Sequence, residues 1–497
     1  MVSGLGSTFR NLLPYGIAAG TVVILTKVFR YGYSYFTKRK EDPINDFSSV
    51  CRNPRLWEKI PQNTPIELGK GNPHFLVGAA TCTYQDSGSI NCINSQWALR
   101  EKTMPANNRS SKGPNLFEVY QNDPQQIIDR LKKLGVNSYR FSIEWSHIQP
   151  HSEKDFDEVK LQVYVNFCKK LKESGIKPMI TLHHFSEPQW FYKLGSFEKE
   201  ENIQHFVNFC VKVFPTLAEH CDYFCTINEP TIEAFSRYVR GAFLPCVTID
   251  FKRGGDFLRG ALKAHNLVYE KLKALKPTAQ IGIVHQRLSF RAANPLLYPI
   301  TRTLSYFVNE VTLNYFKTGI FEMKILFFCR MRDEKLGKLK TDFIGLQYYV
   351  RPLIGFGPTS DFAPMTQMPF HEDPEGIYEA ILEVHEATEK PIIVTENGIS
   401  THDDTQRARY MWRALYATAE AAKKIRKEGL MATENLLGYY VWSLCDNFEW
   451  DMGMNPQKFG AYSMENGTIT QNPKEGMKPF IAWANSLKPS TSQEQVV

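Results

Sequence analysis

Two glutamates follow short apolar stretches, a place where a carboxylate is unexpected. Glu229 comes after the run YFCTI at 223–227, and Glu396 comes after PIIVT at 391–395. A single glutamate at a strand end is most often a solvated loop residue, but two strands of the same design suggest paired carboxylates. Such a pair can bind a metal ion, act as general acid and base, or cleave a glycosidic bond.

The elements that must position these carboxylates alternate between strand and helix. Eight short apolar runs read as strands, at 75–81, 138–143, 178–183, 223–227, 280–285, 342–349, 391–395 and 437–444. Segments with helical periodicity separate them, such as 123–137, where Asp123 can cap and Ile127 and Leu131 share an apolar face. The pattern predicts an α/β fold, a (β/α)8 TIM barrel with long βα loops. A doubly wound sheet would need a glycine-rich phosphate loop, whose spacing GAATCTYQDSG lacks.

In such barrels the C-terminal ends of the strands build the active site. The residues at these ends are amides, histidines, aromatics and carboxylates: Gln85, His183, His184, Asn228, Glu229, Gln347, Tyr348, Tyr349, Glu396, Asn397, Trp442, Glu449 and Trp450. The adjacent histidines point to opposite faces of a strand, so only one can enter the site, and this disfavours a metal centre. Glycoside cleavage fits better, because it needs two carboxylates beside groups that bind hydroxyls and stack on a sugar ring.

Seven motifs give the chain a family resemblance: FLVGAATCTYQ, YRFSIEWS, TLHHF, TINEP, DFIGLQYY, IVTENG and WSLCDNFEW. In this order, over about residues 73–485, they resemble glycoside hydrolase family 1, the retaining β-glycosidases. The resemblance implies that Glu229 is the general acid/base and Glu396 the nucleophile. It also implies that Asn228 holds the sugar 2-hydroxyl and that Tyr349 orients Glu396. The family's sugar-binding positions match Gln85, His184, Trp442, Glu449 and Trp450.

The resemblance implies hydrolysis by double displacement, for which no metal or organic cofactor is needed. A carboxylate at Glu449, near the 4- and 6-hydroxyls, would repel a 6-phosphate, so we expect unphosphorylated β-glucosides or β-galactosides. The chain departs from the family at Gln347 (usually Asn), Phe185-Ser186-Glu187 (usually Trp-Asp-Leu), Asp86-Ser87-Gly88 (usually Val-Glu-Gly) and His147 (usually Arg). None of these changes removes a catalytic group.

Two other functions remain open. The run HHFSEPQW and the N-terminus resemble, more weakly, the plant galactolipid-remodelling branch of the family, which transfers sugars between lipids. A membrane-associated transglycosylase acting on glycolipids is therefore one alternative. A non-enzymatic sugar- or protein-binding module is the other, and the presence of both Glu229 and Glu396 disfavours it. Glucose or galactose, the aglycone, water or a sugar as acceptor, and the oligomeric state are not decided by residue identity.

The N-terminal 40 residues are interpreted separately. The uncharged stretch NLLPYGIAAGTVVILT is short for a spanning helix, which needs about 20 residues, but neighbouring residues can extend it. The cations after it (Lys27, Arg30, Lys38, Arg39 and Lys40) predict a membrane anchor with the catalytic domain facing the cytoplasm. A signal peptide, leaving a secreted or lumenal enzyme, is the alternative. We therefore expect an anchor at 1–40, a linker at 41–70, a catalytic domain at 71–487 and a flexible tail at 488–497.

Composition excludes other classes of protein. The net charge of +7 is modest and the Lys and Arg residues are scattered along the chain, so we expect no nucleic-acid partner. The expected partner is a carbohydrate or glycoside substrate, with a glycolipid as one possibility. The ten cysteines have irregular spacing, which favours free thiols over a disulfide framework.

Overall fold

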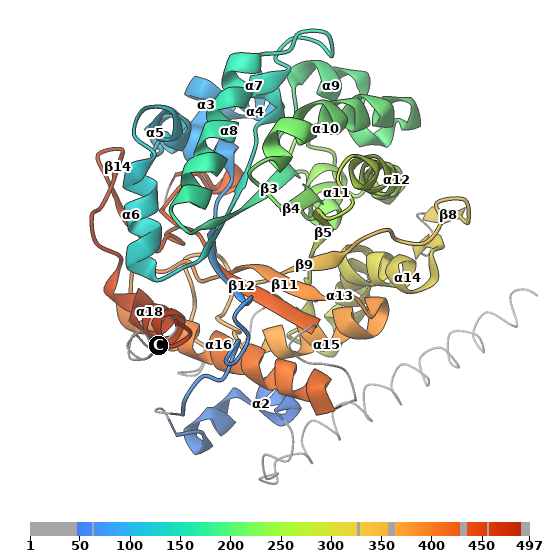
Figure 1. Cartoon of the computed structure of the whole chain (residues 1–497). Coiled ribbons are helices and arrows are strands. Elements are labelled where there is room, and N and C mark those ends of the chain that lie inside the picture. The colour runs from blue at the N-terminus through green and yellow to red at the C-terminus, as the bar shows by residue number, and fades with distance from the viewer. Residues whose placement is uncertain are drawn as a thin grey trace, which may run out of the picture.

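The computed structural model describes residues 47–61, 64–325, 329–355, 363–427, 435–454 and 457–488. Eight parallel strands close a barrel in which each strand pairs with its neighbours in chain order, and the last pairs with the first (Figure 1). The strands are β1 (Leu76–Ala80), β2 (Ser138–Ser142), β3 (Lys177–His183), β4 (Tyr223–Ile227), β5 (Gln280–Gln286), β9 (Phe343–Tyr348), β11 (Ile392–Asn397) and β12 (Leu436–Trp442). The predicted (β/α)8 barrel is confirmed, and each of the eight predicted runs coincides with one barrel strand.

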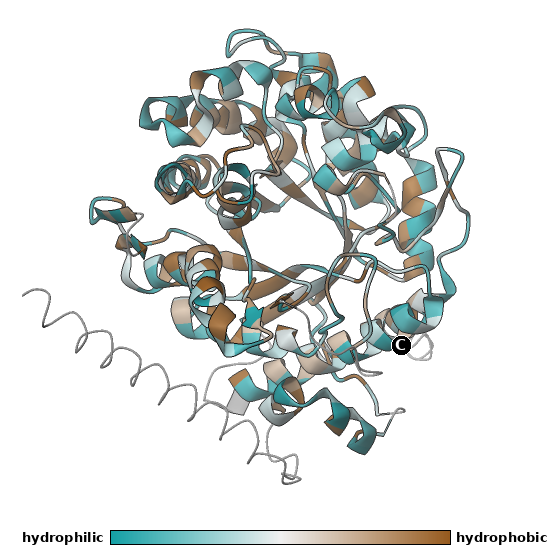
Figure 2. Ribbon diagram, turned by 180° about the vertical axis from the view of Figure 1, so that it is seen from behind, coloured by the Kyte–Doolittle hydropathy of each residue, from teal (hydrophilic) through white to brown (hydrophobic). Residues whose placement is uncertain are grey.

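An outer ring of helices covers the barrel. The main helix after each strand is, in order, α6 (Gln125–Leu134), α8 (Glu158–Glu173), α10 (Ile203–Ala218), α12 (Phe251–Leu275), α14 (Val311–Thr318), α15 (Gly376–Thr388), α16 (Asp404–Lys427) and α18 (Lys478–Ser486). Helix α6 has the apolar face expected from its sequence, with Ile127 and Leu131 fully buried. Figure 2 shows apolar residues concentrated in the strands and hydrophilic residues on the outward helix faces. Strands buried on both faces explain why their sequences are continuously apolar.

The long connections after the strands carry further elements at the C-terminal end of the barrel. They are α3 (Thr83–Asn91), α4 (Gln96–Glu101), α5 (Leu116–Asn122), α7 (Trp145–Ile148), α9 (Gln189–Leu194), α11 (Pro230–Tyr238), β6 (Arg291–Ala292), α13 (Tyr298–Ser305), β10 (Leu353–Ile354), β13 (Met464–Glu465) and β14 (Thr468–Ile469). A hairpin of β7 (Phe321–Ile325) and β8 (Cys329–Asp333) instead precedes strand β9.

A short N-terminal segment precedes the barrel, consisting of α2 (Ser48–Arg52) and the 3-10 helix η1 (Pro54–Lys59). It lies against helices α15 and α16 (Figure 1). These residues fall within the expected linker 41–70, and the structure shows them packed on the barrel. The anchor predicted at 1–40 and nearly all of the predicted tail lie outside the described residues. No described helix combines the length and the apolar character needed to cross a bilayer.

Candidate active site

The two predicted carboxylates meet at the C-terminal end of the barrel. Glu229 follows β4 and forms the N-cap of α11, with a left-handed backbone (φ 42°). Glu396 lies within β11, and both side chains are buried, with exposed fractions of 5% and 3%. Left-handed φ values are uncommon outside glycine and concentrate at functional sites. The sequence placed Glu229 at a strand end, and the structure adds that its carboxylate is carried by a left-handed turn between β4 and α11.

A β-bulge sets the direction of the Glu396 side chain. In β11, Ile392 and Val394 pack with the surrounding helices, whereas Ile393 packs inside the barrel. Strict alternation would therefore point residue 396 at the helices. The pairing of β11 with β9 shifts register between Val394 and Glu396, and such a bulge re-aims the side chains that follow it. The Glu396 carboxyl consequently reaches the barrel mouth.

Arg140 joins the two strand ends. It is fully buried in β2, and its Nη1 donates to Glu396 Oε1 at 2.5 Å while Nη2 donates to Asn228 Oδ1 at 2.6 Å. Gln347 Nε2 donates to the same Asn228 oxygen at 2.8 Å. Tyr349 supplies the second partner of the nucleophile candidate, since its hydroxyl donates to Glu396 Oε2 at 2.6 Å. Sequence reasoning missed Arg140, although a charged residue in an otherwise buried strand is a usable signal.

The two carboxyl groups have unlike surroundings. Within the described residues, no hydrogen bond to the Glu229 carboxyl is found. Burial raises the pKa of Glu229 well above its ordinary value, and the charge of Glu396 raises it further. Burial also raises the pKa of Glu396, but Arg140 and the Tyr349 hydroxyl oppose that increase. Glu396 therefore ionises first, and Glu229 holds the proton that the pair retains.

Several buried polar atoms beside the carboxylates have no hydrogen-bond partner among the described residues: Gln85 Oε1, His184 Nδ1, Asn228 Nδ2, Gln347 Oε1 and Glu449 Oε2. An unpaired buried polar atom costs about 1–3 kcal/mol, so a ligand with many hydroxyls would relieve several such costs at once.

Burial sets the protonation of two of these side chains. It lowers the pKa of His184 well below its ordinary value, and the positive charge of Arg140 lowers it further, so the ring is neutral. Burial raises the pKa of Glu449 to about 8.

An aromatic wall completes the site. The ring of His184 lies 5.9 Å from that of Trp442 and 6.2 Å from that of Trp450, measured between centroids. Phe185, one of the departures from the family pattern, has a left-handed backbone (φ 58°) and packs 5.4 Å from Trp450. The residues predicted to bind sugar thus converge on the two glutamates. His183 instead bonds Glu233 Oε2 outside the barrel, so only one histidine of the pair enters the site.

Two other departures from the family pattern make buried contacts. Glu187 Oε1 accepts a hydrogen bond from Arg237 Nη2 at 2.9 Å, and both side chains are almost fully buried. His147 bonds the hydroxyl of Tyr164 through Nδ1 at 2.8 Å. The first contact joins two βα connections, because Arg237 lies on α11, and the second joins α7 to helix α8 of the outer ring. Neither contact involves Glu229 or Glu396.

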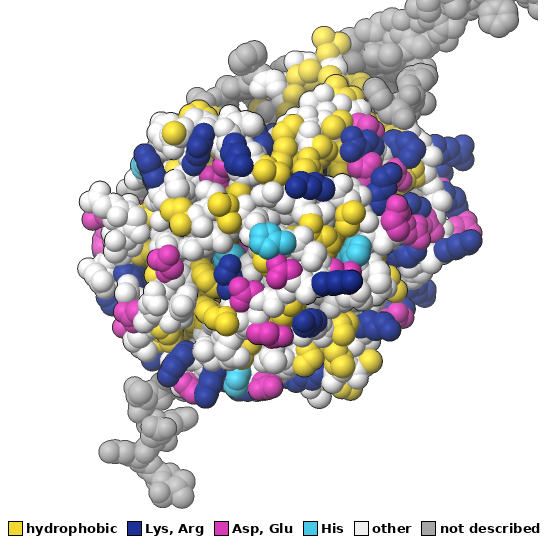
Figure 3. All heavy atoms as spheres, turned by 90° about the horizontal axis from the view of Figure 1, so that it is seen from above, with side chains coloured by type: hydrophobic (Ala, Val, Ile, Leu, Met, Phe, Trp, Pro, Cys, Tyr) yellow, Lys and Arg dark blue, Asp and Glu magenta, His cyan; other side chains and the backbone are white. Residues whose placement is uncertain are grey.

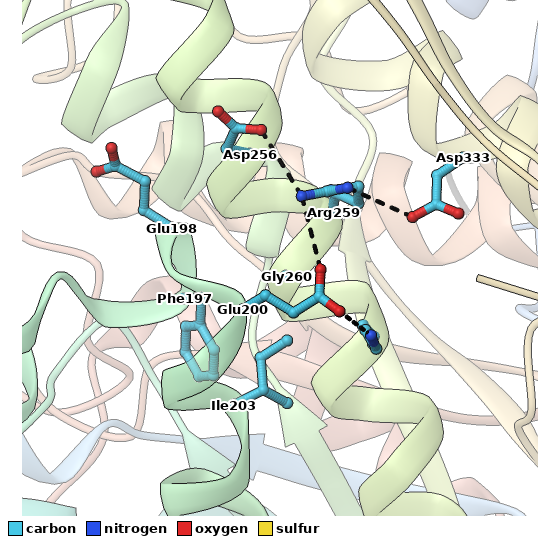
Figure 4. A pocket seen from close by; sticks show the side chains of 9 residues that line it. Phe197, Glu198, Glu200, Ile203, Asp256, Arg259, Gly260 and Asp333 are labelled. Atoms are coloured by element: carbon cyan, nitrogen blue, oxygen red, sulfur yellow. Dashed lines mark hydrogen bonds and ion pairs between the residues drawn. The ribbon is translucent and has the colours of Figure 1, made fainter. Parts of the chain in front are cut away.

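Two features outside the paired carboxylates bear on ligand binding. No group of three or more His, Cys, Asp or Glu residues that could hold a metal occurs in the described part of the chain. The cysteines are free thiols. A pocket between α10, α12 and β8 is lined by charged side chains, and Figure 4 shows Arg259 directed at Glu200, Asp256 and Asp333. Each of its four carboxylates has a basic partner on the outside of the barrel: Arg259 and Lys263 line the pocket, and Lys252 and Arg253 lie beside it.

The protein surface also lacks a marked charge asymmetry on the face drawn in Figure 3. Lys and Arg side chains are interspersed there with Asp and Glu side chains. This agrees with the scattered charges of the sequence and gives no extended basic stripe on that face for a polyanion.

Known proteins resemble this chain in sequence and in structure. The family model described as Glycosyl hydrolase family 1 matches residues 70–487. Beta-glucosidase A of Thermotoga maritima is 29% identical over 428 residues, which cover 79% of this chain and 93% of that protein. A 6-phospho-beta-galactosidase of Clostridium acetobutylicum is 26% identical over 471 residues, covering 81% and 94%.

Solved structures agree with these relatives. The beta-glycosidase from Pyrococcus horikoshii superimposes with a TM-score of 0.70 at 28% identity, covering 85% of this chain and 96% of that one. The family 1 b-glucosidase from Thermotoga maritima gives a TM-score of 0.72 at 26% identity, with coverages of 84% and 98%. The family model spans most of the chain, and the residues that it matches include all eight barrel strands and both buried glutamates. The chain therefore belongs to glycosyl hydrolase family 1 and is a glycoside hydrolase.

Proposed function

We propose that the protein is a retaining β-glycosidase that cleaves unphosphorylated β-glucosides or β-galactosides through Glu396 and Glu229. The observation that carries this proposal is the unequal environment of the two carboxyls. Glu396 has a guanidinium and a phenol as partners, whereas no partner of the Glu229 carboxyl is found in the described structure. A double displacement needs this combination of an ionised nucleophile and a protonated acid.

In the first step a lone pair of the Glu396 carboxylate attacks the anomeric carbon. The bond to the leaving oxygen breaks, and that oxygen takes the proton of Glu229. The product is a glycosyl ester on Glu396. Esterification removes the negative charge of Glu396, so Glu229 loses the nearest charge that raises its pKa. Glu229 then accepts a proton from water, the hydroxide attacks the anomeric carbon, and the Glu396 carboxylate leaves.

The remaining site residues would bind the sugar. Asn228 is held by Arg140 and Gln347 through its oxygen, so its amide N–H groups remain for the 2-hydroxyl. Gln85 and His184 offer further buried polar atoms for hydroxyls. Trp442 and Trp450 provide ring surfaces, and aromatic faces pack well against the C–H groups of a pyranose. Tyr349 would keep the Glu396 carboxylate aimed at the anomeric carbon.

Glu449 supports the assignment to unphosphorylated sugars. A buried carboxyl with an unpaired oxygen can accept from two neighbouring hydroxyls, and when ionised it repels a phosphate. The relatives include both beta-glucosidases and 6-phospho-beta-galactosidases by name, so the choice rests on this side chain. Because burial raises the pKa of Glu449 to about 8, its carboxyl is mostly protonated at neutral pH, and the repulsion develops as the pH rises through that value.

A sugar acceptor in place of water is the alternative outcome of the same chemistry. Glu229 would deprotonate a sugar hydroxyl instead of water, and the glycosyl ester on Glu396 would be transferred. Of the two sequence features that favour a glycolipid acceptor, the N-terminus lies outside the described residues, and the run HHFSEPQW lies within them at 183–190. Product analysis with a glycolipid present in vesicles separates the two, because hydrolysis releases free sugar and transfer does not.

A fluorinated substrate tests the proposed mechanism. A 2-deoxy-2-fluoro-β-glycosyl fluoride slows both steps but leaves a good leaving group, so the glycosyl ester should accumulate. We expect the intact protein to gain the mass of one fluoroglycosyl group, located by peptide mapping on Glu396. The variant Glu396→Gln serves as the unlabelled control. Labelling at another residue, or hydrolysis of the fluorinated substrate without any adduct, would contradict the proposal.

A further inference from the structure

We propose that residues 47–60, which precede the family domain, form a brace that positions Tyr349 and through it the nucleophile Glu396. The family model begins at residue 70, so this N-terminal brace is an addition to the part of the chain that it matches. The inference rests on the proposed function, since it requires that Glu396 be the nucleophile. It assigns a positioning role to a segment that the sequence alone presents as a linker.

The brace is bound tightly to the barrel. Its apolar residues are buried, namely Phe47, Val50, Cys51, Leu56, Trp57 and Ile60. The ring of Phe47 lies 5.2 Å from that of Tyr378 on α15. The indole of Trp57 lies 5.3 Å from Trp412 and 5.5 Å from Tyr416, both on α16. The brace therefore fixes two helices that flank strands β9 and β11 (Figure 1).

A first route from the brace to the active site runs through Arg351. Its Nη2 donates to the carbonyl oxygen of Cys51 at 3.0 Å and to Asp373 Oδ1 at 2.8 Å. Asp373 Oδ2 accepts from Arg351 Nε at 2.7 Å and from the Tyr348 hydroxyl at 2.9 Å. Tyr348 ends β9 and is bonded directly to Tyr349 along the chain. A displacement of the Cys51 carbonyl would leave an N–H of the buried Arg351 guanidinium without its acceptor, which raises the free energy of that state.

A second route runs through helix α16. Tyr410 lies on the same helix as Trp412 and Tyr416, and its hydroxyl donates to the carbonyl oxygen of Tyr349 at 3.3 Å. Asn397, the residue after Glu396, donates through Nδ2 to the Tyr410 hydroxyl at 3.1 Å and to the Tyr348 carbonyl oxygen at 2.5 Å. A shift of α16 would therefore move the backbone on both sides of the contact between Tyr349 and Glu396.

Both routes converge on the same backbone. The first holds Tyr348 by its hydroxyl, and the second holds Tyr349 by its carbonyl group. Tyr349 makes the hydrogen bond of 2.6 Å to Glu396. The ionisable groups Arg140, Cys225, Glu229 and Glu449 also interact electrostatically with this carboxyl. A brace that only covered apolar surface would affect stability alone. A positioning brace must also change how readily Glu396 ionises.

Full-length Trp57→Ala separates these two roles, with Glu58→Ala as a matched control at the exposed neighbouring position. We would measure kcat/KM for a p-nitrophenyl glycoside against pH, together with the melting temperature. We expect Trp57→Ala to lower kcat/KM by about ten- to a hundredfold, the range that a displacement of about 1 Å produces in a catalytic group. Its acid limb should move to higher pH, because a weakened Tyr349 hydrogen bond stabilises the Glu396 carboxylate less. Trp57→Phe should restore most of the activity, and Glu58→Ala should match the wild type.

Tyr349→Phe provides the reference for interpretation. If Tyr349→Phe moves the acid limb and folded Trp57→Ala does not, the brace inference is overturned while the proposed function stands. If neither variant moves the limb, the orientation of Glu396 by Tyr349 is itself wrong, and the inference falls with it. If Trp57→Ala does not accumulate as folded protein, Trp57→Leu is measured in the same way, and an unchanged acid limb there overturns the inference.

Discussion

The substitution Tyr349→Phe tests the electrostatics of the nucleophile with the smallest change in shape. It removes one hydroxyl, which donates to Glu396 Oε2 at 2.6 Å, and leaves the ring in place. A hydrogen bond to a charged, buried acceptor contributes about 1.5–3 kcal/mol. This bond favours the ionised form of Glu396, so its loss makes the carboxyl harder to ionise. Divided by 1.36 kcal/mol per unit, the energy predicts that the acid limb moves up by about 1 to 2 pH units.

The assay is the pH dependence of kcat/KM, whose acid limb reports the free enzyme. Below the limb the variant should lose about tenfold or more relative to wild type, and the loss should shrink as the pH rises. Tyr120→Phe is a suitable control, because it removes a buried hydroxyl that bonds Tyr139 in the core between the strands and the helices and bonds neither glutamate. An acid limb of folded Tyr349→Phe that coincides with that of wild type would refute the reasoning.

Three further outcomes follow from the site. Glu229→Gln should lower kcat for alkyl glycosides by about 10²–10⁴-fold but slow glycosylation by dinitrophenyl glycosides much less; equal losses in pre-steady-state rates would exclude an acid role. Arg140→Met should lower the free energy of unfolding in urea by about 3–5 kcal/mol, because it leaves Glu396 buried without its cation; a loss under 1 kcal/mol would contradict this. Because burial raises the pKa of Glu449 to about 8, discrimination against galactoside 6-phosphates should increase as the pH rises through that value. Glu449→Gln should abolish this increase, and a pH-independent ratio of kcat/KM values in wild type would count against the assignment.

The barrel was predictable because its strands are buried on both faces and therefore form continuous apolar runs. The same logic located Glu229 and Glu396, since polar residues at the C-terminal ends of such strands gather at one mouth. Periodicity did not reveal the direction of Glu396. Strict alternation groups it with Ile392 and Val394, which face the helices, and only the register shift beside it turns the carboxyl inward.

Other features depended on tertiary partners. The charge of Arg140 is unusual in an apolar strand, but its role follows only from the positions of Glu396 and Asn228 beside its guanidinium. The segment 47–60 is too short, and its apolar residues are spaced too irregularly, for its packing to be predicted from sequence. Their indole and phenyl side chains find partners more than 300 residues away in sequence, on α15 and α16.

The most direct test of the central claim is azide rescue of the full-length variant Glu396→Gly, assayed beside wild type with p-nitrophenyl β-glucoside and β-galactoside. Without its nucleophile the variant should be nearly inactive. Azide should enter the vacated space, attack the anomeric carbon and restore release of p-nitrophenol, and the product should be the α-glycosyl azide, of inverted configuration. A variant that keeps wild-type activity without azide, or a rescued product of β configuration, would contradict the assignment of Glu396 as the nucleophile.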